Sequence, residues 1–338
     1  QGTVDGSPIT NTESITFLPG PATTAQTTIT ATPAIITANG ITNSTINIQT
    51  KDAQGNNLTA GGATILLSTT GSATLSTTTD NGNGTYQATI TNTVAETTTI
   101  SGTLGGASIT DTTDITFTPG AVSLTETTIT IVPLALVADG TSTVSVTIQT
   151  KDSFGNNLQT GGLSIALTQD GSASFSALID LGDGRYTAAI SNTVAELVTV
   201  GATIDGETMS NTDQLLFIAG SASPTNSAIT ASLTTVAADG LSSSIITVQT
   251  KDTEGNNLSN GGLDVLLAVT GSAILSTIND EGDGTYTATV TNNLAEIVTI
   301  TGSIEGLMIS GSVNITFTPG ASSAANTTIT ASSSLVTA

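Results

Sequence analysis

The chain has 338 residues, and its 4 basic and 26 acidic side chains give it a formal net charge of −22. Because it contains no His and no Cys, its composition excludes imidazole catalysis, thiol chemistry, disulfides and the usual zinc and iron–sulfur sites. So few basic side chains cannot neutralise a phosphate backbone, and no apolar run reaches the roughly 18 residues of a membrane-spanning helix, so we expect neither a nucleic-acid partner nor a membrane span in this segment.

The sequence repeats itself with a constant period. Gln49-Thr50-Lys51-Asp52 returns unchanged at Gln149 and at Gln249, followed each time by two variable residues and Gly-Asn-Asn-Leu. A fixed period without insertions is typical of tandem structural units. We therefore predict complete units at 21–120, 121–220 and 221–320. Residues 1–20 match the end of a preceding unit, and residues 321–338 match the start of a following one.

Within one unit, apolar and polar residues alternate with the period of two that indicates half-buried β-strands. In the middle unit Val144, Val146 and Ile148 alternate with polar residues, and turn signals such as Asp139-Gly140 separate the runs. No stretch has the 3.6-residue period of a helix. We predict seven strands per unit, which in the first unit cover residues 28–38, 41–52, 63–71, 73–80, 85–92, 97–104 and 111–118.

About seven short strands separated by turns predict a β-sandwich of immunoglobulin type. The expected fold is therefore all-β, with tandem seven-stranded immunoglobulin-like sandwiches in a linear rod. Since Cys and Trp are absent, the core cannot be that of antibody domains. The expected core positions are Tyr86, Tyr186, Tyr286, Phe117, Phe217, Phe317, Ile48, Ile148 and Val248.

Three motifs of the middle unit resemble the bacterial immunoglobulin-like group 1 domain, the repeat of invasin, intimin and giant bacterial adhesins. They are Ala138-Asp139-Gly140, the run Val-Thr-Ile-Gln-Thr-Lys-Asp-x-x-Gly-Asn at 146–156, and Gly-Asp-Gly-Arg-Tyr-Thr-Ala at 182–188. The resemblance covers all three complete units. It implies head-to-tail stacking, an extracellular position at the bacterial cell surface and no catalysis, and it implies no receptor-binding tip for this segment.

We expect the units to form the structural spacer or stalk of a long cell-surface adhesin that projects a distal binding domain. Two alternatives stay open: a subunit or repeat of a self-assembling extracellular filament or sheath, and a receptor-binding module. The expected partners are neighbouring repeats of the same chain, and other copies in the filament alternative. We expect no enzyme, because Ser and Thr have no His or suitable Lys to activate them. The three lysines, Lys51, Lys151 and Lys251, are expected to be exposed, with a Lys–Asn isopeptide bond as the alternative.

The clusters at 80–84, 180–184 and 280–284 are rich in Gly, Asp and Asn but lack the twelfth-position Glu of an EF-hand. A hairpin turn explains them without a metal. Strand directions nevertheless place the turns at Asp139 and at 192–196 at one pole of a unit, and the loop after Asp152 and the turns at 180–183 and Asp205 at the other.

The joints between units would then be acidic, with almost no cations to offset the repulsion. Calcium, which prefers oxygen ligands, is the one cofactor considered; without it we expect an acidic, solvated hinge. The candidate ligands are Glu96 facing Asp152, Asp180, Asp183 and Asp205 at the first joint, and Asp139 and Glu196 facing Asp252, Asp280, Glu281, Asp283 and Glu305 at the second.

Overall fold

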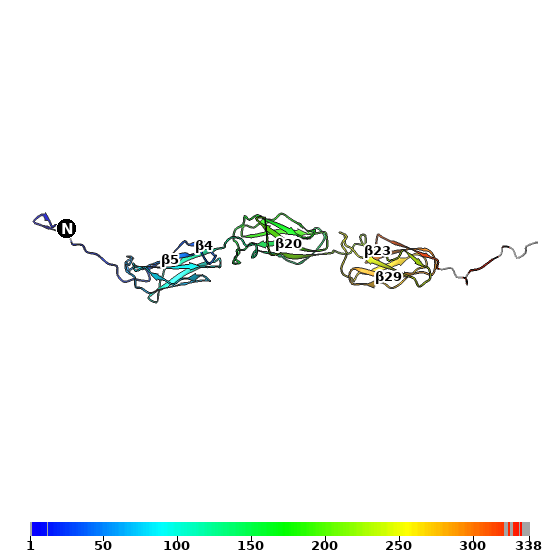
Figure 1. Cartoon of the computed structure of the whole chain (residues 1–338), viewed down its shortest axis with the longest axis horizontal. Helices are drawn as coiled ribbons and strands as arrows, with labels where there is room; N and C mark the ends of the chain where they lie inside the picture. Colours follow the sequence, from blue (N-terminus) through cyan, green and yellow to red (C-terminus); the bar gives the residue numbers. More distant parts are fainter. Residues whose placement is uncertain (1, 12, 321–323, 325–326, 331, 333–338) are drawn as a thin grey trace, which may run out of the picture.

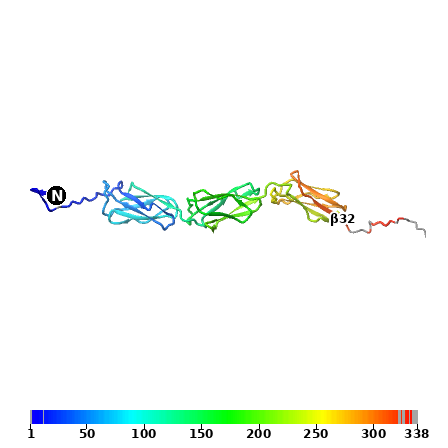
Figure 2. The same cartoon turned by 90° about the horizontal axis from the view of Figure 1, so that it is seen from above.

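The computed structural model describes residues 2–11, 13–320, 324, 327–330 and 332. Three β-sandwiches follow one another in a line, joined by short linkers (Figure 1), and the view turned by 90° shows the same extended rod (Figure 2). The described residues contain strands and no α-helix. The predicted all-β fold of tandem immunoglobulin-like sandwiches in a linear rod is therefore confirmed.

Each sandwich consists of two facing sheets. In the first sandwich one sheet has the order β3-β5-β9-β7, with β8 also on β9, and the other has the order β4-β12-β10-β6, with β11 also on β10. The strands are β3 (Thr28–Thr32), β4 (Ile35–Thr37), β5 (Ser44–Gln49), β6 (Ile65–Thr69), β7 (Thr74–Leu75), β8 (Thr79–Asp80), β9 (Thr85–Thr91), β10 (Thr97–Leu104), β11 (Ala107–Ser108) and β12 (Thr113–Thr118).

The second and third sandwiches repeat this topology. The second is built from β13 (Thr128–Ile131), β14 (Ala135–Val137), β15 (Val144–Gln149), β16 (Ile165–Gln169), β17 (Ser174–Phe175), β18 (Ile179–Asp180), β19 (Arg185–Ser191), β20 (Leu197–Ile204), β21 (Glu207–Thr208) and β22 (Asp213–Ile218). The third is built from β23 (Ala228–Ala231), β24 (Thr235–Ala237), β25 (Ser244–Gln249), β26 (Val265–Val269), β27 (Ile274–Leu275), β28 (Asn279–Asp280), β29 (Thr285–Thr291), β30 (Ile297–Ile304), β31 (Leu307–Met308) and β32 (Val313–Thr318).

Two of the predicted strands are broken, and one short strand was not predicted. The segment 28–38 is not one strand: β3 lies in one sheet, antiparallel to β5, and β4 lies in the other sheet, parallel to the last strand β12. The segment 73–80 is divided into β7 and β8 around Ser76, whose hydroxyl accepts the Thr89 N–H at 2.9 Å. The extra strand β11 forms a two-residue hairpin arm, too short to leave a period-two pattern.

The core lies between the two sheets and contains the predicted aromatic and aliphatic residues. Tyr86 and Phe117 are each 2% exposed and Ile48 is fully buried, and the same positions in the other two sandwiches are buried as well. The Tyr86 hydroxyl also accepts the Ala63 N–H at 2.8 Å. The predicted core positions are therefore confirmed, and the tyrosine hydroxyl also anchors the segment before β6.

Every sandwich has an entry pole and an exit pole. In the first one the incoming chain reaches the loop after β5, where the Thr23 N–H donates to the Lys51 carbonyl at 2.8 Å. At the opposite end, the Ala38 N–H donates to the carbonyl of Thr118, the last residue of β12, at 2.8 Å. The chain therefore enters at one end and leaves at the other, which places successive sandwiches in a line (Figure 1).

Candidate functional site

The entry-pole loop of each sandwich is organised by one buried aspartate. Asp152 is 1% exposed, and its Oδ1 accepts the N–H groups of Phe154 and Asn156, each at 2.9 Å. Its Oδ2 accepts the Asn156 Nδ2–H at 2.9 Å and the N–H of Gly120, in the linker from the first sandwich, also at 2.9 Å. A buried carboxylate with this many N–H donors stays ionised without a cation beside it.

The pKa values follow from these donors. Desolvation by itself would raise the pKa of Asp152, but the hydrogen bonds from Asn156, Gly120 and Phe154 outweigh it, and the pKa lies below its usual range. In the first sandwich the hydrogen bond from the Asn56 side chain, followed by that from the Gly20 N–H, lowers the pKa of Asp52 to about 2. These aspartates are therefore charged at neutral pH.

Asn156 connects the two sandwiches. Its Oδ1 accepts the Ala95 N–H at 2.8 Å, and its Nδ2–H donates to the Thr93 carbonyl at 2.9 Å. Thr93 and Ala95 belong to the exit-pole turn of the first sandwich, between β9 and β10. We call this set of five residues the joint clasp: Thr93, Ala95, Gly120, Asp152 and Asn156.

The second joint has the same clasp. Asn256 accepts the Ala195 N–H at 2.8 Å and donates to the Thr193 carbonyl at 2.9 Å, and Asp252 accepts the Gly220 N–H at 2.9 Å. The strand directions predict this arrangement, in which the exit-pole turn meets the loop after Asp152 or Asp252. The contact itself is made by an amide side chain and backbone groups.

The loop of the clasp does not depend on a preceding sandwich. At the entry pole of the first sandwich the Asn56 Nδ2–H donates to Asp52 Oδ2 at 3.0 Å, and the Gly20 N–H donates to the same oxygen at 3.0 Å. The acceptor surface for a neighbouring turn is therefore preformed by contacts within one sandwich and its linker.

Glu96 and Glu196, the predicted ligands in the exit-pole turns, are engaged inside their own sandwiches. Glu96 Oε1 accepts the Ser72 N–H at 2.7 Å and the Asn92 Nδ2–H at 2.8 Å. The Ser72 N–H is the first cause that lowers the pKa of Glu96. Glu196 makes the equivalent bonds one repeat later.

Asp180 and Asp280 close the predicted hairpin turns. Asp180 accepts the N–H groups of Gly162 at 2.7 Å and Gly182 at 2.8 Å, and Asp280 makes the equivalent bonds one repeat later. Gly182 has a φ of 77°, a conformation that glycine adopts without strain. The interpretation of these clusters as turns is confirmed.

The remaining acidic candidates also bind donors of their own sandwich. These pairs are Asp139 with the N–H groups of Thr141 and Ser142, Asp183 with Arg185, Asp205 with the Ser164 N–H, Glu281 with Asn279 and Thr287, Asp283 with Thr285, and Glu305 with the Asp264 N–H. Within the described ranges no group of three or more acidic side chains is arranged to hold a metal ion. Of the candidates, Asp152 and Asp252 take part in the joint clasps, and calcium binding at the joints stays a prediction.

Sequence reasoning missed Asn156 and Asn256. The Gly-Asn-Asn run was interpreted only as a turn, whereas its first asparagine makes the contact between sandwiches. The available signal was that the two positions before this run vary while the asparagine does not vary in any of the three copies. A turn alone would accept several residues there.

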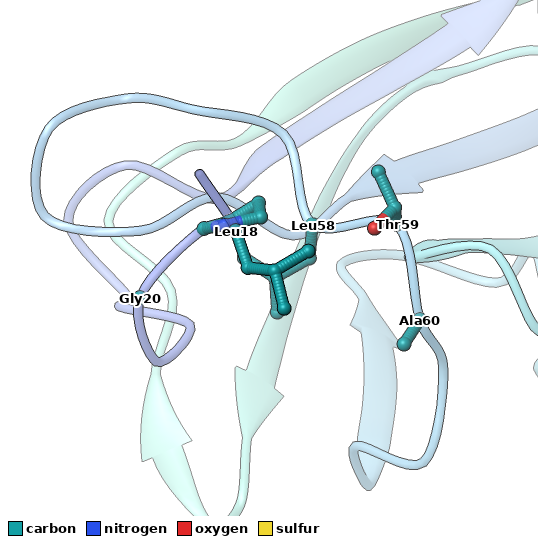
Figure 3. A pocket seen from close by; sticks show the side chains of 6 residues that line it. Leu18, Gly20, Leu58, Thr59 and Ala60 are labelled. Carbon is teal, nitrogen blue, oxygen red and sulfur yellow. The ribbon is translucent and has the colours of Figure 1, made fainter. Parts of the chain in front are cut away.

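A surface hollow lies beside the entry-pole loop. In the first sandwich it measures ≈ 270 Å³ and is lined by Leu18, Pro19, Gly20, Leu58, Thr59 and Ala60, with the Leu18 and Leu58 side chains close together (Figure 3). Its counterpart at the first joint measures ≈ 210 Å³ and is lined by Thr118, Pro119, Gly120, Leu158, Gln159 and Thr160. Neither lining contains a charged side chain. The hollow is the seam along which the linker packs on the loop.

Lys51, Lys151 and Lys251 are half-buried, not exposed as expected, and their backbones bridge those of Asn57, Asn157 and Asn257. The isopeptide alternative stays a prediction. Nowhere in the described part of the chain is there a helix long and apolar enough to cross a membrane.

The family model for domain 3 of invasin matches the chain three times, at residues 23–120, 123–220 and 223–320. Among solved structures, the chain is similar to FdeC, an Escherichia coli adhesin, with 24% identity and a TM-score of 0.57 over 89% of this chain and 100% of that one. It is similar to InvD of Yersinia pseudotuberculosis, with 21% identity and a TM-score of 0.52 over 87% of this chain and 98% of that one.

A third similar structure is invasin, a bacterial integrin-binding protein, with 26% identity and a TM-score of 0.50. The match covers 87% of this chain and 60% of the invasin chain. The likeness to FdeC and InvD shows the fold, and the family matches extend over most of the sequence. The chain therefore belongs to the invasin domain 3 family, the immunoglobulin-like repeats of bacterial adhesins.

Proposed function

We propose that this chain is a stalk segment of a bacterial cell-surface adhesin, which holds a distal binding domain away from the cell. The observation that carries the proposal is the joint clasp, which occurs with the same contacts at both joints. A flexible tether would leave the turn and the loop unbound. Here the turn and the linker are each hydrogen-bonded to the loop.

The linkers support a stiff joint. Only residues 119–127 separate β12 from β13, and this stretch is itself fixed: Val122 bridges Asp152, and the Ser123 N–H donates to the Lys151 carbonyl at 2.7 Å. A net hydrogen bond contributes about 1 kcal/mol, so the two bonds that Asn156 makes to the preceding sandwich contribute roughly 2 kcal/mol. An opened joint is then populated on the order of 1 in 30.

The charge of the chain favours a spacer over a laterally packed filament. With a formal net charge of −22, side-by-side rods repel one another, and this repulsion also keeps an extended protein soluble. An extracellular position fits this surface and is part of the proposal. Catalysis is not part of it, since the related proteins are adhesins.

The proposal includes the unit boundaries 21–120, 121–220 and 221–320. Residues 1–20 would close a preceding unit: β1 (Thr3–Val4) and β2 (Ser7–Pro8) form the same hairpin as β10 with β11. Ile15 and Phe17 are 80% and 91% exposed, whereas their counterparts Ile115 and Phe117 are 0% and 2% exposed. The segment 321–338, most of which lies outside the described residues, would open a following unit.

Deletion of residues 121–220 from the full-length protein tests this function. The cut joins Gly120 to Ser221, so the first and third sandwiches can form a clasp through Ala95 and Asn256. We expect a folded, shorter rod with unchanged binding of the target in solution and reduced attachment of cells to the target. Capture of the target by the purified chain itself would favour a receptor-binding module, and its assembly into fibres would favour the filament.

A further inference from the structure

The second and last strands of each sandwich are parallel neighbours. In the first sandwich β4 pairs with β12, with Phe117 opposite Ile36. The pair is bounded by a bond from the Thr116 N–H to the Ala34 carbonyl at 2.9 Å and by one from the Ala38 N–H to the Thr118 carbonyl at 2.8 Å. The pairs β14·β22 and β24·β32 repeat this arrangement.

Tension along the rod loads this pair in shear. The chain enters at the pole of Asp52 and leaves at the opposite pole through Gly120 (Figure 1). A pull on the two ends therefore acts first on β3, which is paired with β5, and through β3 it draws β4 towards the entry pole, while it draws β12 towards the exit pole. Because the strands are parallel to this pull, their hydrogen bonds are strained together, whereas a peeling force would break them one after another.

We propose that the parallel pair is the tension clamp of each sandwich, and that bearing tensile load is a further function of this chain. The load-bearing role of the clamp in the cell rests on the proposed stalk function. Its mechanics do not depend on the joints, since the covalent linker transmits the load whether or not a clasp is closed.

The three clamps differ in what covers their outer face. In the second sandwich the outward cross-strand pairs are Ala135 with Leu216 and Val137 with Ile218, all apolar. In the first sandwich threonine occupies both corresponding positions of β12, Thr116 and Thr118. In the third sandwich β32 likewise has Thr316 and Thr318.

The apolar cover predicts that the second sandwich resists force best. Leu216 is 43% exposed and Ile218 is 41% exposed, so more than half of the surface of each residue is covered by its neighbours. Water competes with strained backbone hydrogen bonds, and an apolar cover keeps it away. This also accounts for the apolar patch on the outer face of β22 without a docking partner.

Single-molecule force spectroscopy of the whole chain, held at its two termini, tests the proposal. We expect three unfolding events, of which one needs a clearly higher force. The variant Leu216→Thr/Ile218→Thr gives the second sandwich the residues of the other two, and we expect it to reduce the highest force to the level of the other events. The matched control is Phe154→Gln, which replaces an aromatic side chain that is 51% exposed on the entry-pole loop with the residue of the first sandwich, and it should leave the force unchanged.

A change of pulling geometry in the otherwise unaltered chain gives a second readout that needs no destabilising substitution. The chain has no Cys, so cysteines introduced at Thr141 and Ser221 attach handles at the exit end of the pair β14·β22 and peel it apart. We expect a several-fold lower unfolding force for the second sandwich than when it is pulled at the chain termini. Equal forces in the two geometries, or an equal effect of the threonine variant and of Phe154→Gln, would overturn the proposal.

Discussion

The side-chain oxygen of Asn156, in the second sandwich, accepts the backbone N–H of Ala95, in the first, at 2.8 Å. Both groups are partly buried, and the same pair occurs one repeat later between Asn256 and Ala195. One amide thus joins two domains, while Asp152 fixes the loop that presents it. The same contact therefore holds neighbouring sandwiches together at both joints of the rod.

A buried hydroxyl without a hydrogen-bond partner is expected to lower the stability of the first sandwich. Thr98 is fully buried and its Oγ1 has no hydrogen-bond partner, whereas the second sandwich has the fully buried Val198 at this position. We expect Thr98→Val to raise the local free energy of unfolding by about 1–2 kcal/mol and Val198→Thr to lower it by a similar amount. Hydrogen exchange of β10 and β20 amides in the whole chain measures both, and changes of the same sign would contradict this account.

Ser44 and Ser244 occupy the same position but should respond in opposite ways. Ser244 Oγ accepts the Leu233 N–H at 3.0 Å and donates to the Leu233 carbonyl at 2.8 Å. In the first sandwich Pro33 has no N–H to donate, and Ser44 Oγ has no partner.

We expect Ser44→Val to stabilise the first sandwich, because it removes an unsatisfied buried hydroxyl. Ser244→Val should destabilise the third by about 1–3 kcal/mol, because two backbone groups lose their partner. Local hydrogen exchange of β5 and β25 distinguishes the two responses. Loss of stability in both variants would show that the side chain is needed for packing alone.

The core tyrosine contributes through both its ring and its hydroxyl. Tyr186 is 2% exposed, and its hydroxyl accepts the Leu163 N–H at 3.0 Å. Tyr186→Ala should cost about 3–5 kcal/mol of stability, and Tyr186→Phe about 1 kcal/mol, since only the acceptor is lost. Chemical denaturation followed through the second sandwich tests this, and equal losses would mean that the ring packs loosely.

We expect acidic pH to destabilise the entry-pole loops and the joints, and we expect pH changes near neutrality to leave their stability unchanged. The pKa of Asp52 in the folded chain is about 2, below the roughly 4 of an unfolded aspartate. A lowered pKa stabilises the fold above the unfolded value, and this contribution is lost as the pH falls from about 4 to about 2. Since the chain has no His, we expect constant stability between about pH 5 and 8. A melting temperature that changes across that neutral range would contradict this.

The response to calcium distinguishes a metal-bound joint from a joint that is held by the clasp alone. If the acidic candidates bound calcium together, the ion would raise the melting temperature and stiffen the rod, and a chelator would reverse both effects. The clasp predicts no change, because each candidate carboxylate already has donors within its own sandwich or linker. Scattering and thermal unfolding of the chain with calcium and with chelator decide between them.

The sequence predicted the sandwiches well because period-two alternation reports directly which face of a strand is buried. It did not predict that β3 and β4 belong to different sheets. The break occurs at Pro33 in the first sandwich but also at Leu233 in the third, so no single residue type encodes it. The buried positions change phase between Ile29 in β3 and Ile36 in β4, but the two strands were nevertheless predicted as one.

The sequence predicted which loops meet at the joint but not which groups form the contact. Strand directions placed the exit-pole turn against the loop after Asp152. The acidic residues suggested a metal because their partners are mostly backbone N–H groups, such as that of Gly120 for Asp152. Every residue except proline has a backbone N–H, so the sequence does not show which of them a carboxylate binds. The carboxylates were therefore expected to be unpaired.

The most direct test of the rigid rod is the distance distribution across one joint. Spin labels on Thr77→Cys and Ala177→Cys, both exposed and one repeat apart, report the relative placement of the first two sandwiches. We predict a narrow distribution that Asn156→Ala broadens. The control Asn56→Ala, which loses the same loop bond to Asp52 but no contact between sandwiches, should leave it narrow. A distribution in the unaltered chain as broad as that of Asn156→Ala would contradict the account.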